Sequence, residues 1–237
     1  MDKKKVLETI KKARESAKKR NFSQSVDLIV NLQQLDLKKP EQKVDLFINL
    51  PKGRGKKIKV CGLFGPESQK EGEANCDIVI SQDNFHALSK DKRKVKKLIK
   101  EYDFFLGQAN IMPLIAKNFG RSLGTKGKMP NPKAGMIVPP GAPLKPVMEK
   151  MQNMIRLTTK SELVVKGQIG TESMSDDDLA ENIKHVYDKL SNSLPQHEHN
   201  IKNSFLKLTM CKPALLGGKA WNQKLLSQKQ KREQLRN

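Results

Sequence analysis

Val26-Asp27-Leu28-Ile29-Val30-Asn31-Leu32 alternates between apolar and polar side chains, and this period of two predicts a strand buried on one face. A second alternation over residues 44–50 predicts another strand. Residues 4–20 carry apolar side chains at helical spacing among lysines and arginines, which predicts an amphipathic surface helix. One helix and two strands cannot close a core, so the start of the chain needs partners from elsewhere in the sequence.

The last third of the chain supplies those partners. Residues 162–169 and 205–210 predict two more strands. Between them, Ser175 followed by three aspartates is typical of a helix start, because the serine caps the helix and the acids complement its dipole. This helix is expected to reach Leu190. The two ends together predict a four-stranded sheet covered on one side by two helices.

The middle of the chain follows another pattern. Asp77–Ser81 and Asp103–Leu106 are short apolar runs typical of buried parallel strands, and helices are predicted over 91–101 and 113–119. Residues 120–146 hold five glycines and six prolines, which predicts a loop, and helical spacing resumes over 147–155. We therefore predict a composite domain of residues 1–65 and 157–213 and an inserted α/β domain of residues 66–156. The basic tail, residues 214–237, is expected to be disordered in the free protein.

The charge points to a polyanionic partner. The 237 residues hold 46 lysines and arginines against 25 acids, a net charge of +21, and this surplus favours RNA or DNA over a small substrate. No apolar stretch approaches the roughly 20 residues that cross a bilayer, so no membrane partner is expected. The three cysteines lie far apart, which disfavours a disulfide framework or a zinc site and suits a cytoplasmic protein.

Motifs for catalysis are incomplete. Ser122 stands where a phosphate-binding loop before Gly127-Lys128 needs its first glycine, and Ile58 stands where Gly53-Arg54-Gly55 would need its third. His197-Glu198-His199 is better explained as a solvated loop than as a metal site. We therefore predict no enzyme, no cofactor and no metal.

The most informative segment is Gly120-Arg121-Ser122-Leu123-Gly124-Thr125-Lys126-Gly127-Lys128-Met129-Pro130-Asn131-Pro132-Lys133-Ala134-Gly135. Its glycines and prolines shape a stiff path that presents cations, so it either follows phosphates or acts as a rigid hinge between domains. It resembles the L1 (uL1) family of large-subunit ribosomal proteins, whose signature it matches at Arg121, Lys126, Gly127, Lys128, Met129, Pro130, Asn131, Pro132 and Lys133.

The resemblance extends from the first helix to Pro213, and residues 20–26 and 51–56 are similar to the archaeal and eukaryotic branch. It implies an α/β (α+β) fold of two domains: a split β-α-β sandwich built from both chain ends and an inserted Rossmann-like domain. It also implies a monomer within the cytoplasmic ribosome. The implied partners are ribosomal RNA of the mobile stalk near the tRNA exit site, deacylated tRNA and, as a repressor, the protein's own mRNA. A ribosome-biogenesis factor of the same fold is the alternative, and a nucleotide-dependent enzyme a more distant one.

The resemblance also implies a set of RNA-binding residues. Phe22 would stack on a base or ribose, and hydroxyls would reach 2′-hydroxyls or phosphates. Core packing is the alternative for Phe22 and Met210, and a solvated cation for Arg20 and Lys207. Cys211 replaces a glycine that is usual in the family, which would loosen contact there. The full set is Arg20, Phe22, Gln24, Ser25, Lys207, Thr209, Met210 and Lys212.

Overall fold

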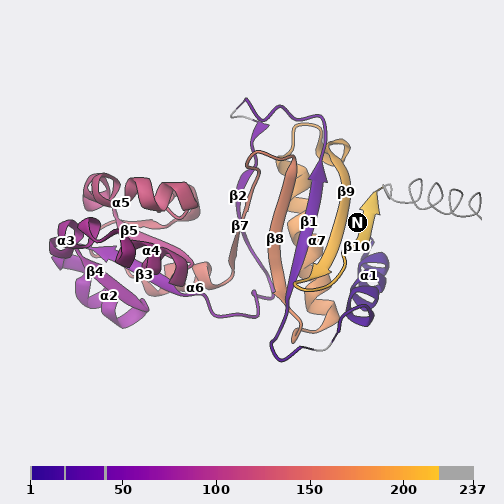
Figure 1. Cartoon of the computed structure of the whole chain (residues 1–237), viewed down its shortest axis with the longest axis horizontal. Helices are drawn as coiled ribbons and strands as arrows, with labels where there is room; N and C mark the ends of the chain where they lie inside the picture. Colours follow the sequence, from indigo (N-terminus) through magenta and orange to yellow (C-terminus); the bar gives the residue numbers. More distant parts are fainter. Residues whose placement is uncertain (1, 19, 40–41, 219–237) are drawn as a thin grey trace, which may run out of the picture. The chain divides into compact units, whose positions relative to one another are not determined.

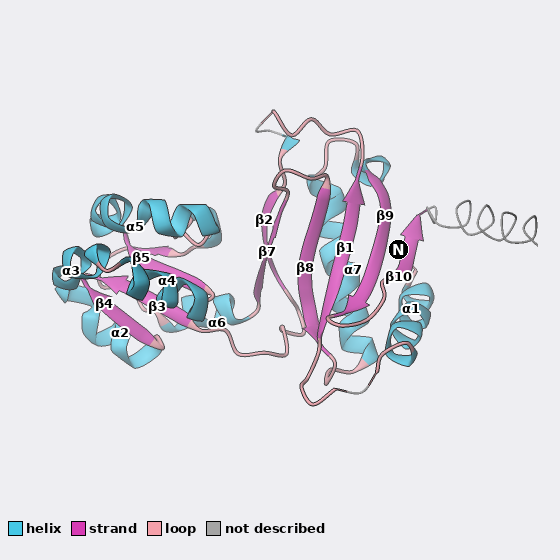
Figure 2. Cartoon of the chain, in the orientation of Figure 1, coloured by secondary structure: helices cyan, strands magenta, loops and turns pink. Residues whose placement is uncertain are grey.

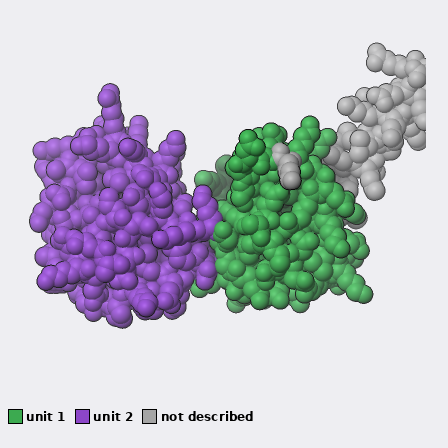
Figure 3. All heavy atoms as spheres, turned by 90° about the horizontal axis from the view of Figure 1, so that it is seen from below, with its two compact units in different colours: residues 1–55, 155–237 green, residues 56–154 purple. Residues whose placement is uncertain are grey.

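The computed structural model of the chain describes residues 2–18, 20–39 and 42–218. The chain forms two compact units (Figure 3). The first, unit 1, combines residues 1–55 with residues from 155 onward, and the second, unit 2, holds residues 56–154. The chain therefore leaves the first unit, completes the second and returns. The two-domain α/β fold class is confirmed.

Unit 1 is built on an antiparallel sheet in the order β10-β9-β1-β8 (Figure 1). Its strands are β1 (Ser25–Leu32), β8 (Val164–Thr171), β9 (Ile201–Leu208) and β10 (Ala214–Gly218). The central strand β1 pairs with β8 on one side and β9 on the other, so Val26 lies opposite both Gly170 and Leu208. The sheet thus joins the two ends of the sequence.

Two helices, α1 (Lys3–Glu15) and α7 (Asp176–Ser193), cover one face of this sheet (Figure 2). The alternation in β1 directs Val26, Leu28 and Val30 into the core that these helices close. The Ser175 hydroxyl accepts a hydrogen bond from the Asp178 backbone N–H at 3.2 Å, which caps α7 as predicted. The opposite face of the sheet carries the polar Asp27 and Lys207 together with the apolar Ile29, Phe205 and Leu215.

A separate two-stranded sheet pairs β2 (Asp45–Asn49) with β7 (Met154–Thr158). The prediction placed the strand of residues 44–50 in the main sheet and continued a helix to residue 155, and both expectations are wrong. The Arg156 guanidinium pairs with the Asp45 carboxylate at 2.8 Å and lies over the Phe47 ring, 5.1 Å from its centre. Ile155 and Leu157, on either side of Arg156, are both buried, which is the period of two of a strand. This pattern overrides the helical spacing of the residues before it.

Unit 2 contains a parallel sheet in the order β4-β3-β5-β6. The side chains of Cys61, Leu63 and Ile80 share a core with α3, α4 and α5, and α2 packs against Val79 from the other side. The strands are β3 (Val60–Phe64), β4 (Ile78–Ser81), β5 (Phe104–Gln108) and β6 (Ile137–Val138), and the helices are α2 (Gln69–Asn75), α3 (Phe85–Lys90), α4 (Lys92–Glu101), α5 (Met112–Lys126) and α6 (Lys145–Gln152). Short 3-10 turns lie at Pro66–Ser68, Gln82–Asn84, Ala109–Ile111, Pro132–Ala134 and, in unit 1, His197–Asn200.

Two domain boundaries in the structure differ from the predicted ones. The prediction gave residues 56–65 to the composite domain, but β3 pairs with β4 and β5 and is buried throughout, so it belongs to the inserted sheet. The predicted tail began at residue 214, but β10 pairs with β9 and buries Leu216. The rest of that tail, residues 219–237, lies outside the described residues.

Two helix ends also differ from the prediction. Helix α1 ends at Glu15 instead of residue 20, and α5 continues through Gly120 and Gly124 to Lys126. Both glycines lie on an open part of the helix surface, with nothing within 4 Å of an added Cβ, so neither marks a turn. Arg121 and Lys126 of the signature therefore lie on a helix, and the loop begins at Gly127.

Candidate RNA-binding surface

Two segments from opposite ends of the chain meet where β1 begins and β9 ends (Figure 1). The Thr209 backbone N–H donates to the Ser25 carbonyl oxygen at 3.1 Å, and the Ser25 N–H donates to the Thr209 hydroxyl oxygen at 3.1 Å. These residues are separated by 184 positions in the sequence. The hydrogen-bonded pair fixes the geometry of both segments before any ligand binds.

The buried residue Gln24 stabilises this junction through hydrogen bonds. Its side chain is 0 % exposed, and its Oε1 accepts a hydrogen bond from the Met210 N–H at 3.2 Å. Its backbone carbonyl oxygen accepts from the Glu172 N–H at 2.8 Å. Gln24 is predicted from the sequence as an RNA-binding residue. In this structure its side chain lies below the surface and positions its neighbours.

Phe22 and Met210 are large apolar side chains left on the surface, with 53 % and 60 % of their area exposed. Met210 is hydrogen-bonded to Gln24, and Phe22 lies two residues before Gln24, so both belong to the same junction. Large apolar side chains exposed at one junction are unfavourable in water and typical of a binding surface. Core packing, the alternative interpretation for both, is excluded by this exposure.

The outer face of the sheet next to the junction places the predicted Lys207 in a charged cluster with Asp27 and Arg54, which were not predicted from the sequence. Lys207 lies opposite Asp27 across β9 and β1, and Gln168 lies opposite Asp27 from β8. The Arg54 guanidinium donates to the Gln168 side-chain oxygen at 2.8 Å. Burial raises the pKa of Asp27, and the positive charges of Lys207 and Arg54 oppose that rise. The signal was present in the sequence, since Asp27 is a polar residue on the second face of β1.

The loop that carries Arg54 is fixed by one buried amide. Asn182 on α7 is fully buried, donates to the Gly53 carbonyl oxygen at 2.9 Å and accepts from the Lys52 N–H at 3.1 Å. Gly55 has a φ of +72°, and a Cβ added there would collide with the Thr171 hydroxyl. The residue pattern of this loop therefore serves to hold Arg54 over the sheet.

The remaining cations of the predicted set have unequal positions. Arg20 and Lys212 are exposed, whereas Lys207 is half-buried beside Asp27. Lys207 is thus part of a charged cluster and not only a solvated cation. We use the term junction surface for the accessible members of the set, which are Arg20, Phe22, Ser25, Lys207, Thr209, Met210 and Lys212.

The signature segment lies in unit 2, and one of its cations, Lys128, faces inward. The Lys128 ammonium donates to the carbonyl oxygens of Ile99 at 2.7 Å and Tyr102 at 2.6 Å, at the C-terminal end of α4. Burial is the main cause that lowers the pKa of Lys128. Positive charge is favourable at a helix C-terminus, so Lys128 is a structural cap of α4 rather than a phosphate contact.

Other signature residues shape the turn after α5. Gly127 ends α5 with a φ of +67°, Pro130 is buried, and the Asn131 side chain accepts a hydrogen bond from the Lys133 N–H at 3.0 Å. Met129 packs against the core of the parallel sheet, and Pro132 begins the short turn Pro132–Ala134. The signature cations left exposed are Arg121, Lys126 and Lys133.

The described residues form neither a metal centre nor a membrane-spanning helix. Among them, no group of three histidines, cysteines, aspartates or glutamates is placed to hold a metal ion. No helix in the same part of the chain has the length and apolar character needed to cross a membrane.

Comparisons with known proteins identify relatives. A model of the ribosomal protein L1p/L10e family matches residues 11–212. The large ribosomal subunit protein uL1 of Methanothermococcus thermolithotrophicus is 39 % identical over 214 residues, which cover 90 % of this chain and 98 % of that protein. The protein of the same name from Nanoarchaeum equitans is 42 % identical over 208 residues, which cover 86 % and 95 % of the two chains.

These comparisons bear on the predicted identity. The family consists of ribosomal proteins, which are structural and not catalytic, so the prediction that the chain is not an enzyme is confirmed. The match covers both units and the aligned relatives are archaeal. The chain therefore belongs to the L1 family of ribosomal proteins and is of the archaeal type.

Proposed function

We propose that the protein is a structural constituent of the large ribosomal subunit that binds ribosomal RNA of the mobile stalk, near the tRNA exit site, through the junction surface. The observation that carries this proposal is the hydrogen-bonded union of Ser25 with Thr209 and of Gln24 with Met210. Phe22 and Met210 are both exposed, in a chain of net charge +21. Relatives named as large ribosomal subunit proteins support the same assignment.

Each part of the junction surface has a chemical task in this proposal. The Phe22 ring stacks on a base or ribose, and Met210 packs beside it. The exposed Thr209 hydroxyl contacts a 2′-hydroxyl, which distinguishes RNA from DNA. Arg20 and Lys212 neutralise phosphates and add affinity that depends on salt. Because the junction is fixed before binding, little conformational entropy is lost when RNA binds.

Replacement of the exposed ring tests the proposal. Phe22→Ala is expected to weaken binding to stalk RNA by about 1–3 kcal/mol, while binding to an unrelated hairpin changes little. Leu114→Ala removes an exposed apolar side chain from α5 in unit 2 and serves as the matched control. Equal losses for both RNAs, or no preference of the unaltered protein for stalk RNA at moderate salt, would refute the proposed site.

A role in the release of deacylated tRNA is the second part of the proposal. The exposed signature cations Arg121, Lys126 and Lys133 support it, because they present positive charge from unit 2. Ribosomes that carry all three as alanine are expected to release deacylated tRNA more slowly, with unchanged binding of the protein to stalk RNA. An unchanged release rate would remove this part.

Repression of the protein's own mRNA is the third part. An mRNA segment that folds like the stalk RNA would bind the same junction surface, since the surface recognises a folded shape. Added protein is then expected to inhibit translation of its own message in vitro, and Phe22→Ala to relieve that inhibition. A message that is translated equally with and without the protein would contradict repression.

The alternative, a ribosome-biogenesis factor of the same fold, differs in where the protein is found. We expect stoichiometric amounts in mature large subunits after sedimentation. Presence only in precursor particles would favour the alternative.

A further inference from the structure

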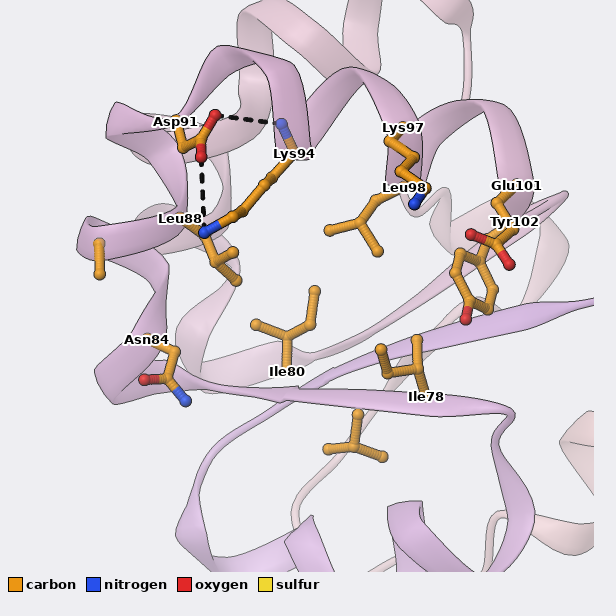
Figure 4. A pocket seen from close by; sticks show the side chains of 12 residues that line it. Ile78, Ile80, Asn84, Leu88, Asp91, Lys94, Lys97, Leu98, Glu101 and Tyr102 are labelled. Carbon is orange, nitrogen blue, oxygen red and sulfur yellow. Dashed lines mark hydrogen bonds and ion pairs between the residues drawn. The ribbon is translucent and has the colours of Figure 1, made fainter.

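An apolar groove of about 570 Å³ runs along one edge of unit 2, far in the sequence from the junction surface (Figure 4). Strand β4 forms one wall and helices α3 and α4 form the other. The apolar side chains that line it are those of Ile78, Ile80, Ala87, Leu88, Leu98 and Tyr102. Its volume is in the range that holds a ligand.

Strand β4 is the edge strand of the parallel sheet and pairs only with β3 among the described strands. The Asp77 N–H donates to the Val60 carbonyl oxygen at 3.2 Å, so the odd-numbered positions turn their backbone groups toward β3. The N–H and C=O groups of Ile78 and Ile80 consequently point away from the sheet. The groove therefore presents a strand edge with free backbone groups beside an apolar cleft.

The rim of the groove carries two lysines and two carboxylates, and one of these lysines has no acidic partner among the described residues. Helix α4 carries six lysines and arginines in ten residues, and Lys94 and Lys97 lie at the groove. The Lys94 ammonium forms an ion pair with the Asp91 carboxylate at 3.5 Å. The Glu101 carboxylate pairs with the Lys59 ammonium, also at 3.5 Å. Within the described part of the chain, Lys97 has no ion pair or side-chain hydrogen bond, so its charge is available to a partner.

We infer that this groove binds an extended acidic peptide segment of another protein, which adds to the sheet as a strand next to β4. Backbone hydrogen bonds to Ile78 and Ile80 would align the peptide, and its alternate apolar side chains would enter the cleft. Acidic side chains between them would meet Lys94 and Lys97. The binding surface is separate from the junction surface, so this inference does not depend on the proposed RNA-binding role.

The lining favours a peptide over RNA. Single-stranded RNA is held by exposed aromatic faces, and the one aromatic residue here, Tyr102, is only 9 % exposed. An edge strand with unpaired backbone groups offers nothing specific to a nucleic acid. It is, however, a template on which another strand can pair.

Selection from a displayed library of random peptides on the full chain tests the inference. We expect enriched peptides in which apolar residues alternate with Asp or Glu. Lys97→Glu is expected to weaken their binding by about threefold to tenfold, because an attraction becomes a repulsion. Lys96→Glu changes the same charge on α4 at an exposed position that does not line the groove, and is expected to leave binding nearly unchanged.

Two further measurements locate the peptide. Ile78→Pro removes an outward N–H that the fold does not use, and it is expected to abolish peptide binding while stalk RNA binding persists. In the unaltered protein, a selected peptide should slow amide hydrogen exchange at Ile78 and Ile80, which makes the test independent of whether the variant folds. Three results would each overturn the inference: unchanged exchange at both amides, enriched peptides without acidic residues, or displacement of the peptide by oligouridylate.

Discussion

At the scale of single residues, the junction depends on side chains that do not themselves face the solvent. Gln24 is buried and connects Met210 to the start of β1, while Glu172 connects to Gln24 through the backbone. A glutamine at this position looks like one more polar surface residue in the sequence. Its burial follows from the register between β1 and β9, which no local pattern reveals.

Removal of the Gln24 side chain is therefore expected to act on stability as well as on binding. Gln24→Ala leaves the Met210 N–H without its acceptor, and the free energy of unfolding should fall by about 1–3 kcal/mol. Ser23→Ala, at the exposed neighbouring position, should change it little. Urea unfolding of the two variants makes the comparison, and equal stabilities would show that Gln24 has no positioning role.

Asp27 gives a pH-dependent prediction. Its pKa in the folded protein is raised above the ordinary 3.8 by burial, so the folded state holds the proton more tightly than the unfolded state. The free energy of unfolding contributed by Asp27 therefore falls as pH rises through the interval between 3.8 and the raised pKa. Asp27→Asn should remove this loss, so the stability of the variant relative to the unaltered protein should grow over that interval. A difference that is constant with pH, measured by urea unfolding, would contradict the assignment.

At the scale of elements, the sequence patterns predicted those helices and strands whose formation depends on local interactions. The alternation of β1 and the capped start of α7 were found because each follows from its own residues. Strand β7 was missed because Met151 and Met154 imitate helical spacing, and its pairing with β2 joins residues 45 and 156. The role of Lys128 was missed for the same reason, since its partners Ile99 and Tyr102 lie on another helix.

The contact of Lys128 with α4 predicts a structural defect rather than a loss of RNA binding. Lys128→Ala leaves two carbonyl oxygens at the end of α4 without a donor and should lower the stability of unit 2 by about 1–3 kcal/mol. Lys126→Ala, at an exposed position nearby, serves as the control. Thermal unfolding followed together with stalk RNA affinity separates the two effects. A variant of normal stability with weaker RNA affinity would instead make Lys128 an RNA contact.

At the scale of the whole molecule, the chain closes one unit from its two ends and places another between them. The consequence is that the junction surface forms only after residues near 25 and 209 have paired. Composition gave the class of partner through the net charge of +21, but it could not locate the surface, because cations are spread along the sequence. The proposed location rests on two exposed apolar side chains, Phe22 and Met210, and on the hydrogen bonds that join the two chain segments.

The central claim is that both chain ends form one RNA-binding surface, and a double-mutant cycle on Phe22 and Met210 tests it most directly. Affinities for stalk RNA are measured for the unaltered protein, Phe22→Ala, Met210→Ala and the double variant. Residues on one surface that contact the same RNA element are expected to couple by about 0.5–3 kcal/mol, with little effect on an unrelated hairpin. Strictly additive losses, or losses equal for both RNAs, would contradict a single surface.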